Sequence, residues 1–193
     1  MKNNLIFIGM PAVGKSSVGI VIAKRLRMKF IDTDLLIQEQ ENKFLREIIN
    51  EKGKQGFLAI ENQVNLGVNP RRAVISPGGS IVYCKEAMEH YKKIGTVVYL
   101  QASYPTIRRR IRSLTKRGVV LEEGQTFRQL YHERSKLFEK YADVTVSCDD
   151  SSMEETIALA LRRIRKYWRY LRNKERRRQA REQAEKATEK LGE

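Results

Sequence analysis

Short runs of apolar residues alternate along this chain with longer segments in which apolar residues recur every three or four positions. The short runs favour strands, and the longer segments have the period of amphipathic helices. Strands are predicted over residues 5–8, 29–32, 73–76, 96–100 and 144–147. Helices are predicted over residues 13–26, 35–50 (as one or two helices), 57–66, 104–114, 126–140 and from 153 onward.

The order of these elements defines a fold class. The strands are almost continuously apolar, and helical segments separate them. This arrangement is typical of an α/β protein with a parallel sheet that has helices on both faces. Ligands of such proteins bind beyond the carboxyl ends of the strands, so we expect the functional residues there.

The first predicted strand runs directly into the sequence GMPAVGKS at residues 9–16, which has the P-loop pattern GxxxxGKS. Its glycines allow a tight turn whose backbone N–H groups face a bound phosphate at the start of a helix. Lys15 is expected to reach the β- and γ-phosphates, and the Ser16 hydroxyl to bind Mg²⁺. We therefore predict a nucleoside triphosphate site; a glycine turn beside a solvated lysine is the alternative.

The second predicted strand ends in Asp32-Thr33-Asp34. Carboxylates two residues apart on a strand point to the same side. Near a P-loop magnesium ion, one of them can hold the ion through water, and the other can orient or deprotonate an acceptor hydroxyl. The structural alternative is a helix N-cap at Asp34.

The charge of the chain is unevenly distributed. Lys and Arg number 38 against 23 Asp and Glu, a net charge of +15 that raises the question of nucleic acid or an anionic membrane. Residues 162–193 hold 13 basic and 5 acidic residues, whereas residues 1–161 hold 25 and 18. More than half of the excess therefore lies in the last sixth of the chain.

Two other protein classes are disfavoured by the sequence. Two cysteines are too few for a disulfide framework or a structural zinc site, and they suggest a reducing compartment. The apolar run at residues 5–10 is too short for a membrane span and lacks the cleavage site of a signal peptide. We expect a cytoplasmic protein with no membrane partner.

With these motifs in order, the chain resembles the shikimate kinase family over about residues 3–165. The marks of the resemblance are residues 9–16, 32–34, Phe57 with Glu61, 77–80, 97–100, Arg117, Arg134 with 137–138, and 142–144. The resemblance implies a three-layer P-loop kinase with a five-stranded parallel sheet and a mobile lid at about 113–124. It also implies MgATP-dependent phosphorylation of the shikimate 3-hydroxyl.

The resemblance also implies roles for single residues. Asp34 would grip the acceptor hydroxyls and act as the base, with Lys15 and Arg117 as the other catalytic residues. Ser16 and Asp32 would hold Mg²⁺, Asp32 through water. ATP binding is implied for Ala12, Val13, Gly14, Lys15, Ser16, Ser17, Arg110 and Arg117. Acceptor binding is implied for Asp34, Gly78, Gly79 and Arg134.

The chain departs from the family pattern around the acceptor. Leu58 stands where the family has a second carboxylate-binding arginine, and a leucine offers no charge-assisted hydrogen bond. Lys54 replaces an acidic residue and offers a positive charge from another direction; Pro77 replaces a glycine. We therefore keep two alternatives open: another hydroxy acid or hydroxy amino acid as the acceptor, and an inactive relative of the family.

The last segment divides in two. Apolar residues at helical spacing, the last of them Leu171, predict that the final helix packs on a kinase domain spanning residues 1–171. Residues 172–193 are expected to form a basic, solvated helical extension. A nucleotide-binding module that uses this extension on nucleic acid is the remaining, less favoured interpretation. The resemblance implies a monomer.

Overall fold

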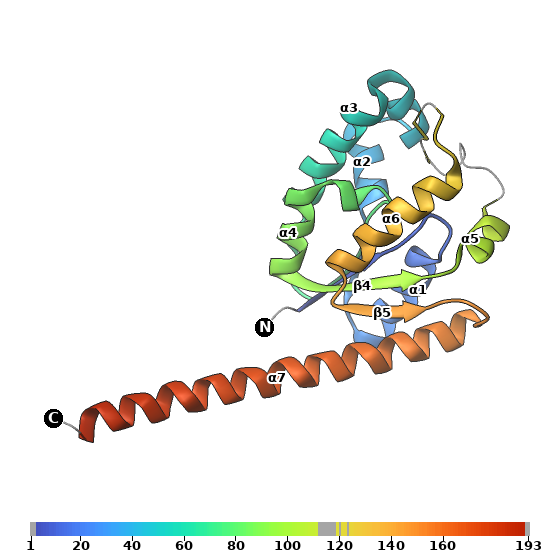
Figure 1. Ribbon diagram of the computed structural model, residues 1–193. Coiled ribbons are helices and arrows are strands. Elements are labelled where there is room, and N and C mark those ends of the chain that lie inside the picture. The colour runs from blue at the N-terminus through green and yellow to red at the C-terminus, as the bar shows by residue number, and fades with distance from the viewer. Residues whose placement is uncertain (1–2, 112–118, 120, 123, 192–193) are drawn as a thin grey trace.

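The computed structural model of the protein describes residues 3–111, 119, 121–122 and 124–191 (Figure 1). One all-parallel sheet in the order β2-β3-β1-β4-β5 forms its centre. Its strands are β1 Asn4–Ile8, β2 Lys29–Asp32, β3 Ala73–Ser76, β4 Gly95–Gln101 and β5 Val144–Ser147. The predicted strands and the predicted α/β fold class are thereby confirmed.

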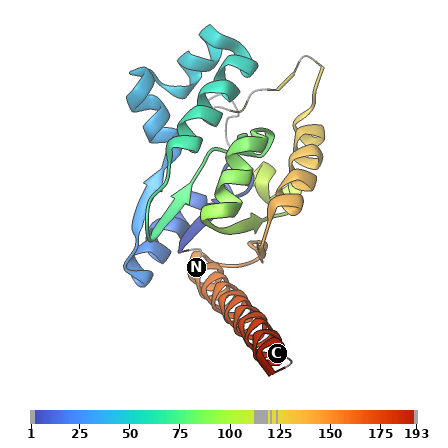
Figure 2. The same cartoon turned by 90° about the vertical axis from the view of Figure 1, so that its left-hand side faces the viewer.

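Helices cover both faces of this sheet, as the sequence predicts (Figures 1 and 2). Helices α1 and α7 pack together and contact the sheet, while α4 and α6 contact β4. The helical elements are α1 Lys15–Leu26, α2 Thr33–Glu41, α3 Leu45–Gly67, the 3₁₀ turn η1 Ile81–Tyr83, α4 Lys85–Ile94, α5 Tyr104–Arg110, α6 Phe127–Tyr141 and α7 Met153–Leu191.

The central strand β1 fixes the position of the P-loop. Residues 5–8 of this strand are fully buried. Ile6 pairs with Ile75 of β3 on one side and with Val97 of β4 on the other. Because both neighbours run parallel to β1, the carboxyl ends of β1 and β3 lie at the same edge of the sheet, and the loop after β1 opens there.

The main differences from the predicted helices concern α4, α5 and α3. Helix α4 was not predicted, because only Ala87, Met88 and Tyr91 of its ten residues are buried and charged residues surround them in sequence. The helix from Tyr104 ends at Arg110 rather than at residue 114. Helix α3 joins two predicted helices across a kink at Gly53, whose φ of 66° is readily adopted by glycine.

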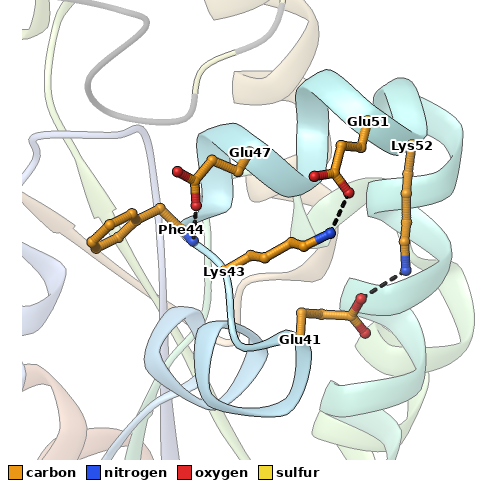
Figure 3. Close-up of polar contacts among 6 residues, drawn as sticks. All are labelled: Glu41, Lys43, Phe44, Glu47, Glu51 and Lys52. Atoms are coloured by element: carbon orange, nitrogen blue, oxygen red, sulfur yellow. Dashed lines mark hydrogen bonds and ion pairs between the residues drawn. The ribbon is translucent and has the colours of Figure 1, made fainter.

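Polar contacts fix the junction between α2 and the first part of α3 (Figure 3). Lys43 pairs with Glu51 at 2.6 Å, and Lys52 pairs with Glu41 at 2.7 Å. The Phe44 N–H donates a hydrogen bond of 2.8 Å to the Glu47 carboxylate, which closes the N-terminus of α3. These contacts hold α3, which carries Lys54 and Glu61, against α2, which carries Asp34.

Helix α7 continues far beyond the rest of the molecule (Figures 1 and 2). Its first part is anchored by buried Ile164 and by Trp168, whose Nε1 donates a 3.0 Å hydrogen bond to Thr96 Oγ1. From Arg172 to Ala180 every side chain is exposed. No helix in the described part of the chain is both long and apolar enough for a membrane span.

Candidate active site

The P-loop backbone has the geometry its sequence predicts. Ala12 and Gly14 have φ values of 64° and 107°, both in the left-handed region. Backbone turns of this kind orient successive N–H groups toward one centre and bind anions. A Cβ at Gly9 would lie 2.5 Å from the Leu100 carbonyl oxygen, so only glycine fits where the loop crosses β4. Helix α1 begins at Lys15 and adds the positive end of its dipole to the loop.

Lys15 lies over this loop. Its Nζ donates hydrogen bonds to the carbonyls of Gly9 at 3.0 Å and Met10 at 3.3 Å. Burial lowers the pKa of Lys15 to about 8, although the nearby Asp34 carboxylate opposes that shift. The ammonium group is therefore mostly charged at neutral pH and suits the β- and γ-phosphates of a nucleotide.

Three oxygen-bearing side chains meet where β2 and β3 end beside the P-loop. Ser16 Oγ donates a 2.8 Å hydrogen bond to Asp32 Oδ2 and lies 3.3 Å from Ser76 Oγ. Mg²⁺ prefers oxygen ligands, and P-loop sites supply it with one hydroxyl, one or two carboxylates, water and the nucleotide phosphates. These residues fit a magnesium site, and Ser76 is a neighbour for which the sequence predicted no role.

Asp32, not Asp34, caps helix α2. Its Oδ1 accepts a 3.1 Å hydrogen bond from the Asp34 N–H, so the proposed N-cap at Asp34 was wrong. The Asp34 carboxylate consequently stays free of that bond, and its Oδ1 is buried with no hydrogen-bond partner among the described residues. Burial raises the pKa of Asp34 to about 6, which the Lys15 charge partly offsets. A carboxylate with this pKa is ionised at neutral pH and can accept a proton.

Gly78 brings the loop after β3 against two carboxylates. A Cβ at this position would lie 2.6 Å from Glu61 Oε1 and 2.8 Å from Asp34 Oδ1. A Cβ at Gly79 would lie 3.3 Å from an Nη of Arg134 and 3.0 Å from Pro11. The two glycines thus place backbone, instead of side chains, between Asp34 and Arg134.

Glu61 is one of the marks of the family resemblance, but no role was predicted for it. It is completely buried on α3, and its oxygens have no hydrogen-bond partner among the described residues. Burial raises the pKa of Glu61 to about 8, so it is mostly protonated at neutral pH. The signal was present in the sequence: Phe57, Glu61 and Asn65 follow one another at four-residue spacing on the buried face of α3.

Arg134 on α6 is 4% exposed, and its Nε has no hydrogen-bond partner in the described part of the chain. Its guanidinium lies 5.3 Å from the ring centre of Tyr83. Lys54 Nζ lies 5.2 Å from the same ring centre and pairs with Glu122 at 2.5 Å. The cations of Lys54 on α3 and Arg134 on α6 therefore both lie near the Tyr83 ring.

Arg110 links the P-loop to the segment that follows β5. Its guanidinium donates hydrogen bonds to the carbonyls of Val13 at 3.4 Å and Cys148 at 3.2 Å. Ser17 is exposed on the first turn of α1. The predicted lid at 113–124 is described only in part, and Arg117 lies outside the described residues.

The chain is similar to known proteins of one family. The family model described as shikimate kinase matches residues 11–165. The chain belongs to the shikimate kinase family. A shikimate kinase of Sulfurihydrogenibium sp. (strain YO3AOP1) is 30% identical over 164 residues, which cover 84% of this chain and 98% of the relative. That of Thermodesulfovibrio yellowstonii is 32% identical over 155 residues, covering 79% and 89%.

Solved shikimate kinases have the same fold. The structure of the Aquifex aeolicus enzyme has a TM-score of 0.74 at 26% identity, covering 84% of this chain and 96% of that one. The Acinetobacter baumannii enzyme, solved in complex with shikimate, has a TM-score of 0.77 at 24% identity, covering 84% and 92%. The P-loop kinase fold is thus confirmed, and the family is one of ATP- and Mg²⁺-dependent phosphotransferases that act on a hydroxyl group.

Proposed function

We propose that this protein transfers the γ-phosphoryl group of ATP to a hydroxyl of shikimate. The observation that carries the proposal is the Asp34 carboxylate between Lys15 of the phosphate loop and the glycine turn at Gly78, whose buried Oδ1 has no hydrogen-bond partner among the described residues. A purely regulatory nucleotide switch has no need of such a carboxylate, and an acceptor hydroxyl does.

The nucleotide side of the site supplies binding and electrostatics. The backbone of residues 9–16 would cradle the phosphates, and Lys15 would balance the charge that develops during transfer. Ser16 and Asp32 would hold Mg²⁺, which neutralises phosphate charge when bound. Arg110 would face the nucleotide from between the P-loop and the loop at Cys148. We assign Arg117 to the transferring phosphate through the family resemblance.

The acceptor side would orient one hydroxyl and remove its proton. Asp34 would accept the proton of the attacking hydroxyl, because its pKa of about 6 leaves it ionised near pH 7. Protonated Glu61 can donate a hydrogen bond beside it without adding a second negative charge. Gly78 and Gly79 would let the acceptor ring approach the backbone.

We further propose that Lys54 and Arg134 together bind the acceptor carboxylate. Both cations lie over the Tyr83 ring, and Leu58 supplies no charge on α3. Among the described residues, the Nε of buried Arg134 has no hydrogen-bond partner, and Lys54 has one ion-pair partner, the exposed Glu122. A carboxylate that binds here would replace Glu122 as the partner of Lys54.

Shikimate has to be distinguished from a second candidate acceptor, another hydroxy acid or hydroxy amino acid. The altered α3 charges at positions 54 and 58 are the observation that keeps this candidate open. ADP release, coupled to a spectrophotometric assay, should be measured with shikimate, homoserine, threonine and gluconate. We expect shikimate to give the highest kcat/KM. A higher value for another acceptor would reassign the substrate, and no turnover with any of them would refute the kinase proposal.

The oligomeric state and cellular location complete the proposal. Both cysteines are buried free thiols, as expected in a reducing compartment such as the cytoplasm. From the family resemblance we propose an active monomer of 22.5 kDa. Light scattering after size exclusion would give that mass, and a stable dimer mass at assay concentration would contradict it.

A further inference from the structure

The exposed part of α7 concentrates positive charge to an unusual degree. Residues 162–180 contain ten arginine or lysine residues and one acidic residue, Glu175. All ten basic side chains are exposed. At about 1.5 Å per residue, this stretch of helix is about 28 Å long. It lies mostly beyond residue 165, where the family match ends.

This charge is not neutralised within the described part of the chain. Of the ten basic residues only Arg178 forms an ion pair there, with Glu175 at 2.7 Å and Glu182 at 3.6 Å. Basic residues instead follow one another at four-residue spacing, as in Arg165–Arg169 and Arg172–Arg176. Like charges at this spacing destabilise a helix, and a polyanion bound along it would relieve their repulsion.

The composition of the segment selects among anionic partners. Residues 172–180 include no apolar side chain larger than Ala180, so this segment has no apolar face to insert into a bilayer. A protein interface would need several apolar or aromatic residues in its core; residues 172–180 offer none, and within residues 162–171 the one exposed large apolar side chain is Tyr170. Eight of the ten basic residues are arginine, whose guanidinium binds phosphate with two parallel hydrogen bonds.

We propose that residues 162–180 of α7 bind the phosphate backbone of a nucleic acid duplex, without base specificity. A duplex carries one negative charge per about 1.7 Å of axis, so about 28 Å of helix faces a continuous row of phosphates. The kinase site is built from other elements, and the two activities are independent.

The test uses the full chain and two variants that lose the same number of charges. In the first, Arg169, Arg172, Arg176 and Arg177 are changed to Gln. In the matched control, the exposed residues Lys24, Lys85, Lys93 and Lys140 are changed to Gln. Binding to fluorescent DNA and RNA duplexes of about 20 base pairs and to phosphatidylserine vesicles is measured by anisotropy or sedimentation, at several salt concentrations.

We expect the wild type to bind at least one duplex, with an affinity that falls by about 10²–10³-fold between about 50 and 200 mM salt. The α7 variant should bind at least about tenfold more weakly, with a shallower salt dependence, while the control variant stays close to wild type. Kinase activity should be the same in all three proteins.

Three results would overturn the proposal. The first is no binding to either duplex at low salt, and the second is binding to vesicles alone. The third is an equal loss of affinity in the two variants, which would assign the binding to net charge instead of to α7. Retained kinase activity in the α7 variant shows that any loss of binding is not a loss of fold.

Discussion

The nucleotide side and the acceptor side of this site are built in different ways. The nucleotide side is mostly one continuous stretch, residues 9–16, whose backbone turns are set by local sequence. The acceptor side is assembled from side chains of α2, α3 and α6 and from the loop after β3. A continuous phosphate loop is constrained by the chemistry of one ligand group, whereas a distributed pocket can change one residue at a time. This explains how the P-loop keeps its full pattern while positions 54 and 58 depart from the family.

The largest expected effect comes from a substitution that changes the acceptor side alone. Asp34→Asn removes the proposed base but keeps its size, so kcat should fall by about 10²–10⁴-fold while ATP affinity stays within about twofold. Coupled ADP release gives kcat, and calorimetry gives ATP affinity. Glu39→Gln, an exposed acid on the same helix, is the control and should behave as wild type. An Asp34→Asn enzyme with near wild-type kcat would remove Asp34 from the mechanism.

The corresponding change on the nucleotide side should affect both measurements. Lys15→Ala removes the ammonium that lies over the P-loop, so kcat should fall by about 10²–10³-fold. Unlike Asp34→Asn, this variant should also bind ATP more weakly in calorimetry. Unchanged ATP affinity would mean that the two sides are not separable in the way we describe.

A smaller effect on kinetics is expected from a substitution that tests carboxylate binding in the acceptor pocket. Lys54→Met should raise the KM of a carboxylated acceptor about 10–100-fold, because a charge-assisted contact is lost, and leave the KM of ATP within about twofold. Lys54→Arg should restore most of the loss. Lys52→Met is the matched control, because Lys52 lies on the same helix as Lys54 and pairs with Glu41 of α2. Equal effects of the changes at positions 52 and 54 would contradict a direct role of Lys54.

The nucleotide side could be predicted from the sequence better than the acceptor side. The P-loop and the pair Asp32 and Asp34 could be predicted because each is local and follows a predicted strand. The meeting of Lys54, Tyr83 and Arg134 could not, because it depends on how α3, η1 and α6 pack. Helix α4 was missed because only three of its residues are buried. The family resemblance supplied Arg134, and tertiary structure supplied its neighbours.

The smallest expected effect is on the pH dependence of the free energy of unfolding. Burial raises the pKa of Glu61 from 4.5 to about 8, so the folded protein binds a proton that the unfolded chain releases between those values. The stabilisation is complete below about pH 4.5 and is lost as pH rises toward about 8. Glu61→Gln should remove this dependence, reducing the loss of unfolding free energy between about pH 5 and 8 by roughly 1–3 kcal/mol. Urea unfolding of the wild type and of Glu61→Gln at both pH values measures these free energies. The same pH dependence in the two proteins would contradict a buried, protonated Glu61.

The most direct test of the central claim identifies the product. Phosphorus NMR of a reaction that contains the protein, MgATP and shikimate follows the γ-phosphoryl group to its acceptor. We predict one new phosphomonoester signal that grows in equal amount to ADP, and growth of this signal that is slower by about 10²–10⁴-fold when Asp34→Asn replaces the wild type. ADP accompanied only by inorganic phosphate, or no ADP in the presence of shikimate, would contradict the account.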